Sequence, residues 1–318
     1  MISRALLLGL VLVASQAFGQ AFPNRPLRLV VPFPPGGPTD QVSRLLSQKL
    51  GETLGQPIVV DNRPGGGAQI AATALLQSPA DGYTILIGDI GALAINKSLY
   101  QNLSYDPQRD FRAVTNVMTA PMVLIVPAKS SANSVAELLD LAKRNGRLSY
   151  ASQGIGTGGH LLGEMFQKAS GATLIHVPYK GGGPAMQDLI AGQVDLLFDA
   201  MGAAVPQARG GKAKILAVGD AKRSPRTPEV PTMAEAGFPD VQMVVWFGMV
   251  AHAKTPDAII RRLNSEIVSA LNSPDVSKRL SDQGFDPAPS TPEAFDALMR
   301  EESVKWAAVV KASGARVD

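Results

Sequence analysis

The chain has 318 residues, of which 45% are apolar and 18% are charged. At roughly 100 to 200 residues per domain this length predicts about two domains, and the composition excludes wholesale disorder. The formal net charge of +3 is too small to indicate a nucleic-acid-binding surface. Cysteine is absent, which excludes disulfides, Cys-ligated metal centres, thiol nucleophiles and a lipid-modified N-terminal cysteine. Only 3 histidines occur, so a His-rich metal site is not expected.

The first twenty residues differ in composition from the rest. Arg4 precedes an apolar run over residues 5–14, which is shorter than the about 20 residues that a membrane span needs. Ala17 and Gly19 supply small residues for cleavage. A buried N-terminal helix is the alternative, but the run lacks the polar face that such a helix keeps. We therefore predict a secretory signal over residues 1–20 and a soluble mature chain outside the cytoplasmic membrane.

Short β-rich runs alternate with amphipathic segments along the rest of the chain, which is typical of βαβ units and a mainly parallel sheet. We expect strands over residues 27–33, 58–60 and 83–87, and helices over residues 38–54 and 68–77. In the first helix Val42, Leu46 and Leu50 recur at helical spacing. Pro121 cannot donate to a strand ladder and interrupts two extended runs, 114–118 and 122–126, so it marks a candidate crossover between domains.

The second half of the chain repeats this alternation. We expect helices over residues 135–144, 157–169 and 183–191, and strands over residues 148–151, 174–177, 194–198 and 215–218. The apolar run 243–251 resembles a second crossover. Helices over residues 256–271, 274–283 and 292–310 close the chain, each with proline near its first turn. The pattern predicts an α/β protein of two lobes with two crossings, and it leaves open to which lobe the C-terminal helices return.

A Pro- and Gly-rich turn over residues 32–40 follows the first strand. Its prolines stiffen the loop, and Gly36 and Gly37 let the backbone approach a ligand. Because a helix begins at Pro38, the free N–H groups of its first turn favour an anion. The alternative is a rigid turn in which Thr39 or Asp40 caps the helix.

A second Gly-rich turn, over residues 152–160, occupies the corresponding place in the second lobe. Gly154, Gly156 and Gly159 match the dinucleotide pattern G-x-G-x-x-G between a strand and a helix. The next strand, however, ends without an Asp or Glu to take a ribose hydroxyl, so a carboxylate-sized anion at the helix N-terminus fits the residues better. We interpret His160 as a hydrogen-bonding residue of the helix start rather than a base.

A third turn, over residues 179–184, places Lys180 beside three glycines. Lys180 either adds positive charge at a helix N-terminus or lies in an ordinary solvated loop. The turn lacks the G-K-[ST] ending of a phosphate-binding loop, and no G-x-S-x-G or H-E-x-x-H motif occurs in the chain. Asp195 and Asp199 lie four residues apart, but on a strand and its exit they form no evident acid and base pair. The residues therefore indicate anion-attracting turns without catalytic chemistry.

Six segments along the mature chain carry a resemblance to a known family. They are RPLRLVVPFPPGGPTD (25–40), DNRPG (61–65), PADGY (79–83), HVPYKG (176–181), AGQVD (191–195) and PTMAEAG (231–237). In this order they resemble the Bug (Bordetella uptake gene) family of periplasmic solute receptors of tripartite tricarboxylate transporters.

The resemblance implies a type II periplasmic-binding-protein fold, with two doubly wound lobes joined by two crossover strands and a ligand cleft between them. It implies a signal peptide over 1–20, a first lobe of residues 21–121 and 244–318, and a second lobe of residues 122–243. It further implies a periplasmic, monomeric receptor without cofactor or metal, which delivers a small carboxylate to a two-component membrane permease. By matching position, the ligand-binding residues would be Gly36, Gly37, Thr39, Asp40, Ser152, Gly156, Thr157, His160, Lys180 and Asp199.

One segment departs from the family. Relatives commonly carry hydroxyl-bearing residues after the third strand, where this chain has Asp89 and Ile90. An Asp89 that faces the cleft would favour a monocarboxylate or a zwitterion over citrate. In the alternative, Asp89 caps the following helix and faces away from the ligand. A secreted hydrolase or dehydrogenase that uses the cleft remains the alternative to a receptor.

Overall fold

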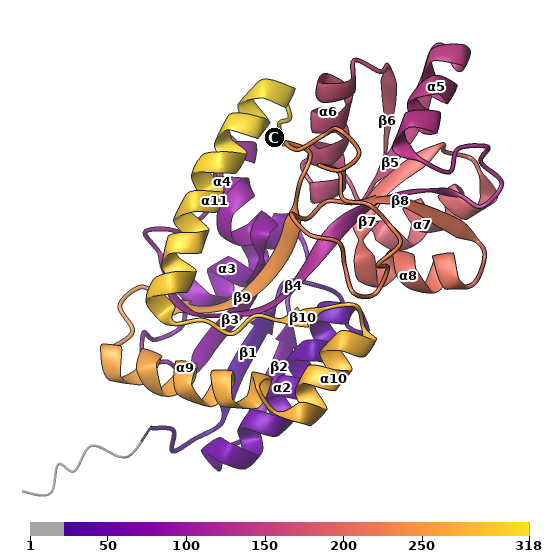
Figure 1. Ribbon diagram of the computed structural model, residues 1–318. Coiled ribbons are helices and arrows are strands. Elements are labelled where there is room, and N and C mark those ends of the chain that lie inside the picture. Colours follow the sequence, from indigo (N-terminus) through magenta and orange to yellow (C-terminus); the bar gives the residue numbers. More distant parts are fainter. Residues whose placement is uncertain (1–21, 318) are drawn as a thin grey trace, which may run out of the picture.

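The computed structural model describes residues 22–317, and its chain forms two α/β lobes connected by two long strands (Figure 1). The predicted signal segment over residues 1–20 lies outside the described residues. The first lobe begins with three parallel strands, covered by helices on both faces. These elements are β1 (Leu27–Val31), α2 (Pro38–Leu54), β2 (Ile58–Asn62), η2 (Gly66–Ala68), α3 (Gln69–Leu76) and β3 (Thr84–Asp89).

Two strands cross between the lobes, β4 (Phe111–Pro127) and β9 (Val244–His252). They run antiparallel to one another from the pair Phe111 and His252 to the pair Pro121 and Val244. From Met122 onward β4 pairs with strands of the second lobe instead. The interruption predicted at Pro121 is therefore wrong, because its missing N–H falls where the strand changes partners and the strand continues through it. The change of strand partners falls next to Pro121, the residue proposed from the sequence as the crossover.

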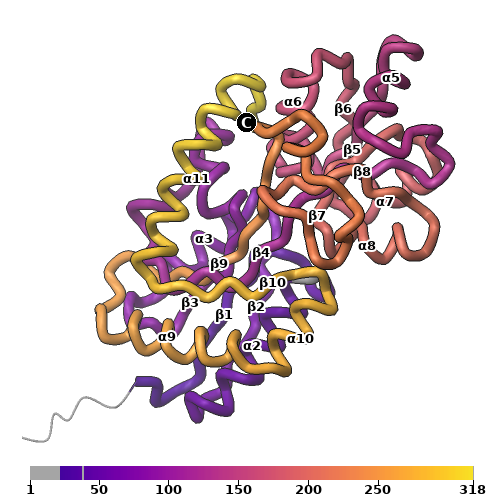
Figure 2. The backbone as a smooth tube through the Cα atoms, in the orientation of Figure 1, coloured from indigo at the N-terminus to yellow at the C-terminus, as the bar shows by residue number. Residues whose placement is uncertain are grey.

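The second lobe follows β4 and again alternates helices and strands, as the tube in Figure 2 traces. Its elements are α5 (Val135–Asn145), β5 (Leu148–Ser152), α6 (Gly158–Ser170), β6 (Leu174–Pro178), α7 (Gly182–Ala191), β7 (Leu196–Ala200), α8 (Met201–Arg209) and β8 (Ala213–Val218). Ser134 caps α5 by accepting a hydrogen bond from the backbone N–H of Glu137 at 3.1 Å.

The last elements are α9 (Asp257–Leu271), α10 (Pro274–Asp282), β10 (Asp286–Pro287) and α11 (Pro292–Ser313). Helices α9 and α10 pack against α2, and β10 pairs with β4 at Thr119 and Met118. Helix α11 packs along β4 and on the segment after β3, which consists of η3 (Gly91–Ile95) and α4 (Asn96–Leu99). Its C-terminal end also contacts α6 of the second lobe (Figure 1).

Both faces of the sheet are buried. In β1, Leu29 and Val31 pack in the cluster formed with α2 and α9, whereas Val30 packs in the cluster on the opposite face. In β4, Val123 and Leu124 divide between two clusters in the same manner. Continuous apolar runs are the expected sequence of strands that are covered on both sides.

The strand order is β2-β1-β3-β9-β4-β7-β5-β6. Its two halves follow one plan, because β1 and β5 are central, β2 and β6 flank them on one side, and β3 and β7 flank them on the other. Strand β9 then completes the first half and β4 the second. The Gly-rich turns after β1 and β5 therefore occupy equivalent positions at the carboxyl ends of parallel strands, where ligands of such sheets bind.

Candidate functional site

The turn after β1 is held in place by the carboxylate of Asp40, which is 2% exposed. Its Oδ2 accepts hydrogen bonds from the backbone N–H of Gly36 at 2.9 Å and from Arg44 Nε at 3.0 Å. Its Oδ1 accepts from Asn62 Nδ2 at 2.9 Å, and the same amide donates to Phe33 O at 3.0 Å. Burial raises the pKa of Asp40, but the hydrogen bonds from Arg44, Gly36 and Asn62 outweigh it and lower the pKa. The charged form of Asp40 thus fixes the loop.

The first turn of α2 is left open for an acceptor from outside the helix. Gly37 is the N-cap residue, and no side chain caps this helix. Capping by Thr39 or Asp40, the alternative considered from the sequence, is therefore wrong. By helix geometry the N–H groups of Thr39 and Asp40 have no intrahelical acceptor. Gly36 has φ of +87°, a left-handed conformation that glycine adopts without strain.

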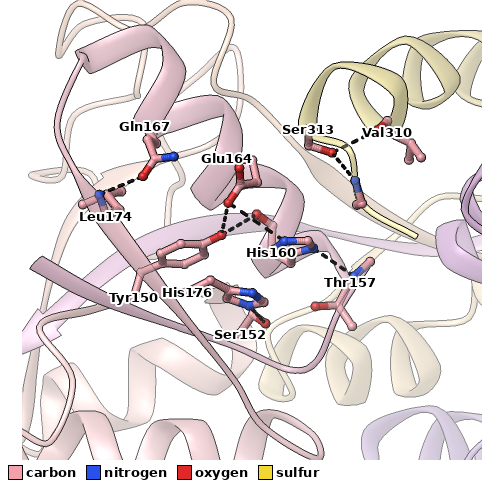
Figure 3. A network of polar contacts seen from close by, with 12 residues as sticks. Tyr150, Ser152, Thr157, His160, Glu164, Gln167, Leu174, His176, Val310 and Ser313 are labelled. Carbon is pink, nitrogen blue, oxygen red and sulfur yellow. Dashed lines mark hydrogen bonds and ion pairs between the residues drawn. The ribbon is translucent and has the colours of Figure 1, made fainter. Parts of the chain in front are cut away.

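The turn after β5 is organised by Ser152, whose side chain is fully buried. Its Oγ accepts a hydrogen bond from the N–H of Gly154 at 3.1 Å and lies 2.7 Å from Nε2 of His176. Thr157 Oγ1 donates to Gly154 O at 2.7 Å. The backbone N–H of Gly156 donates to Nδ1 of His160 at 3.0 Å (Figure 3). His160 therefore does serve as a hydrogen-bonding residue of the helix start.

Two histidine rings stack beneath this turn, as Figure 3 shows. The centroids of His160 and His176 lie 4.2 Å apart, and Tyr150 stacks on the other side of His176 at 4.8 Å. Burial, assisted by the neighbouring His160, lowers the pKa of His176 from 6.5 to about 4. Burial also lowers the pKa of His160, although the charge of Glu164 opposes this shift. Both rings are thus kept neutral at pH 7, and the Nδ1 atom of His160 remains free to accept from Gly156.

The third turn packs against the second. Tyr179 N–H donates to Ser152 O at 3.1 Å, and Gly181 N–H donates to Gln153 O at 3.1 Å. Gly181 is the N-cap of α7, which again has no side-chain cap. Lys180 is exposed and forms no ion pair within residues 22–317. The structure therefore brings the backbone of this turn to the site and leaves the Lys180 side chain in solvent.

Asp199 ends β7 and is 8% exposed. Its Oδ1 accepts a hydrogen bond from the N–H of Ala200 at 2.8 Å. Burial raises the pKa of Asp199 to about 6, although Ala200 and the side chain of Gln153 oppose the shift by donating hydrogen bonds. Gln153 was not singled out from the sequence, yet its Nε2 also donates to Phe198 O at 2.9 Å. The sequence signal that could have identified Gln153 is its position directly after a predicted strand, opposite the end of another strand.

Asp89 ends β3 and is partly exposed. Its Oδ1 accepts a hydrogen bond from the N–H of Ala92 at 2.9 Å, so it does cap the segment that follows. Burial raises its pKa, and the donation from Ala92 opposes the rise. In the ladder between β3 and β9, Asp89 lies opposite Phe247. The ring centroid of Phe247 lies 6.4 Å from that of Phe33. Asp89 is therefore beside the beginning of the first Gly-rich turn.

The two lobes touch where only glycine leaves room. A Cβ atom on Gly156 would lie 2.0 Å from Leu99 Cδ2, at the end of α4 in the first lobe. A Cβ atom on Gly202, in α8, would lie 2.3 Å from Gln283 O, which follows α10. These contacts between distant segments had no counterpart in the sequence pattern.

The described residues contain no cluster of metal-binding side chains. Within residues 22–317, no group of three or more His, Asp or Glu side chains is placed to hold a metal ion. In the same range, every helix is too short or too polar to cross a lipid bilayer.

The family model described as tripartite tricarboxylate transporter family receptor matches residues 42–315. Protein BugT of Bordetella pertussis is 38% identical over 307 residues, which cover 96% of this chain and 94% of BugT. A structure of an R. palustris protein with adipate has 37% identity and a TM-score of 0.85, and the match covers 93% of this chain and all of that one. The periplasmic binding protein BugD has 36% identity and a TM-score of 0.81 over 93% of this chain and 99% of its own.

These similarities confirm the predicted periplasmic-binding-protein fold and remove the enzyme alternative. The chain belongs to the Bug family of tripartite tricarboxylate transporter receptors, whose members are solute-binding proteins.

Proposed function

We propose that this receptor binds a small organic carboxylate between its lobes through backbone N–H groups of the turns after β1 and β5. The observation that carries the proposal is the equivalence of these two turns. Each follows the central strand of its half of the sheet, and each leads into a helix, α2 or α6, without a side-chain cap. Uncapped helix N-termini are suited to anions because their N–H groups and helix dipole favour negative charge.

The contacts assign different tasks to the proposed site residues. Asp40, Ser152 and His160 hold the turns through the hydrogen bonds described above. The ligand would then be bound by the backbone at the remaining positions, with Asp89 and Asp199 at the adjacent strand ends and Lys180 at the rim. The backbone positions are Gly36, Gly37, Thr39, Gly156 and Thr157. The N–H groups of Gly36 and Gly156 already donate to Asp40 and His160, so these two glycines would give the ligand room, and the N–H groups in the first turns of α2 and α6 would bind it. The adipate complex of the R. palustris protein supports a carboxylate as the ligand class.

We further propose that the receptor acts as a monomer in the periplasm and delivers its ligand to a two-component membrane permease. The family description supports a transporter partner. The proposed lobe boundaries are residues 21–121 with 244–318, and residues 122–243. The partner change of β4 after Pro121 and the start of β9 at Val244 support these boundaries.

The experiment is a screen of mono-, di- and tricarboxylates by melting temperature and calorimetry. A ligand at 100 times its Kd should stabilise the protein by about 2.7 kcal/mol. Gly37→Val tests the backbone role, because Gly37 has φ of −74° and a Cβ there would meet only Pro34 O at 3.8 Å. We expect a fold of normal stability with affinity reduced at least about tenfold. Gly51→Ala, near the other end of α2, is the control and should bind normally. No stabilisation by any acid would refute the proposal.

A further inference from the structure

One side chain holds the second Gly-rich turn close to its tip. His160 is the third residue of α6, and its Nδ1 accepts the hydrogen bond from the backbone N–H of Gly156 at 3.0 Å (Figure 3). The arrangement is similar to a capping box, in which the side chain at this helical position reaches back to a backbone N–H at the helix start. His160 is 8% exposed. A buried backbone N–H therefore depends on one histidine nitrogen as its acceptor.

The contacts of His160 determine where its ring proton lies. A nitrogen that accepts from an N–H carries no proton, so the neutral ring carries its proton on Nε2. Nε2 lies 3.9 Å from Oε1 of Glu164, and the same carboxylate oxygen accepts a hydrogen bond from the Tyr150 hydroxyl at 2.5 Å. The negative charge of Glu164 favours the tautomer with its proton on that side. Glu164 thus leaves Nδ1 free to accept from Gly156.

Neighbouring elements bring further titratable side chains to α6. They are Tyr150 from β5, His176 from β6, Asp199 from β7 and Asp240 from the segment before β9, with Lys168 of α6 itself in the groove against α11. The ring of His176 stacks on His160, with centroids 4.2 Å apart, so two charged rings would repel one another. Burial lowers the pKa of His160 below its usual 6.5, and the charge of Glu164 opposes this shift. The neutral ring is therefore favoured at pH 7.

Protonation of His160 would break its hold on the turn. The added proton must go to Nδ1, because Nε2 already carries one, and a ring with both nitrogens protonated accepts no hydrogen bond. The N–H of Gly156 would then face an N–H of the ring. Gly156 also lies against the first lobe, since a Cβ there would approach Leu99 Cδ2 to 2.0 Å. A displaced turn would thus disturb both the start of α6 and the contact between the lobes.

We propose that His160 is a proton-sensitive positioning residue: the receptor binds its ligand tightly while Nδ1 of His160 accepts from Gly156, and weakly once that nitrogen is protonated. This inference rests on the proposed carboxylate-binding function and adds a regulation of the same site. Its sign follows from proton linkage. A ligand that binds the neutral form has its full affinity above the pKa of His160, and loses up to about tenfold in affinity per pH unit below it.

Two substitutions at this position separate the hydrogen bond from the packing. In His160→Asn the amide oxygen can replace Nδ1 as the acceptor for Gly156, but it does not titrate. In His160→Leu the N–H of Gly156 loses its acceptor. His252→Asn is the control, because Nδ1 of His252 likewise accepts a backbone N–H, from Lys254 at 3.1 Å, at the end of β9 that lies away from the crossover.

Calorimetry measures the Kd of the acid that stabilises the protein most, from about pH 7.5 to about pH 4.5, on either side of the ordinary histidine pKa. At the upper pH we expect His160→Leu to bind roughly 5 to 100 times more weakly than His160→Asn, the range for a buried donor left without its acceptor. Towards acid the native protein should weaken relative to His160→Asn, and His252→Asn should weaken with the native protein. Titration of the ligand and of Asp199 is common to these proteins and cancels in their ratio.

Nitrogen NMR of the native protein identifies the tautomer, and we expect Nδ1 of His160 to be unprotonated and Nε2 to be protonated at neutral pH. A proton on Nδ1, equal affinities of the Asn and Leu variants, or the same pH dependence in the native protein and His160→Asn would overturn the inference and leave the proposed function intact. Failure of the native protein to bind any acid would refute both. If His160→Leu does not fold, the comparison of the native protein with His160→Asn decides the matter.

Discussion

Replacing Gly156 by alanine tests the contact between the second Gly-rich turn and the first lobe. Gly156 has φ of +77°, and alanine in this left-handed conformation costs about 1–2 kcal/mol. The new Cβ would also lie 2.0 Å from Leu99 Cδ2 and 2.8 Å from Cδ1. Leu99 is 3% exposed and packed in the core, so it cannot move aside freely, and overpacking adds about 1–3 kcal/mol.

Gly146 is the matched control, because it also has φ of +77° but nothing lies within 4 Å of its Cβ position. Gly146→Ala should therefore show only the backbone cost. Thermal unfolding measures the difference, at roughly 1–2 °C per kcal/mol for a protein of this size. We expect Gly156→Ala to melt at a lower temperature than Gly146→Ala and to bind the ligand more weakly, since the lobes must separate to relieve the clash.

A double-mutant cycle isolates the contact. Leu99→Ala alone removes a buried side chain and should destabilise the protein. Combined with Gly156→Ala it should cost about 1–3 kcal/mol less than the sum of the two single changes, because the clash is gone. Additive energies, or equal stability and ligand affinity for the alanine variants of Gly146 and Gly156, would refute the contact.

Three further substitutions test the core, the histidine stack and the rim. Gly248→Ala would place a Cβ 1.9 Å from Phe295 Cζ, so we expect about 1–3 kcal/mol of destabilisation by denaturant unfolding. The pKa of His176 lies at about 4 in the fold against 6.5 ordinarily, so the contribution of His176 to stability should be lost as the pH drops from about 6.5 to 4, by at most about 3 kcal/mol. The raised pKa values of Asp89 and Asp199 act in the opposite direction, so the loss is measured as the difference between the stability curves of the native protein and His176→Gln. Lys180→Ala should change the ligand Kd less than about threefold, because the side chain is exposed.

The regular elements were predictable because their patterns are local. Helix α2 has the predicted bounds, since Pro38 opens it, apolar residues recur at helical spacing, and Gly55 ends it in a left-handed conformation. Strand β9 was found from its continuous apolar run, which is typical of a strand buried on both faces.

Two segments were missed because their sequences carry contrary signals. Helix α8 contains Gly202 and Pro206, which normally argue against a helix. The helix has only 9 residues, and its packing against β8 and β4 outweighs these two residues. Asp89 was considered as a cap, but the segment η3 that follows it consists of glycine and apolar residues only, so it shows no amphipathic helical pattern. At the site, the turns could be located from their glycines, whereas the stack of His160 on His176 depends on strand pairing that no local pattern specifies.

The most direct test is a crystal structure of the mature protein with the acid that raises its melting temperature most. The account predicts a carboxylate within about 3 Å of backbone N–H groups in the first turns of α2 and α6. A ligand bound away from both turns, or one whose carboxylate is held mainly by the Lys180 side chain, would contradict it.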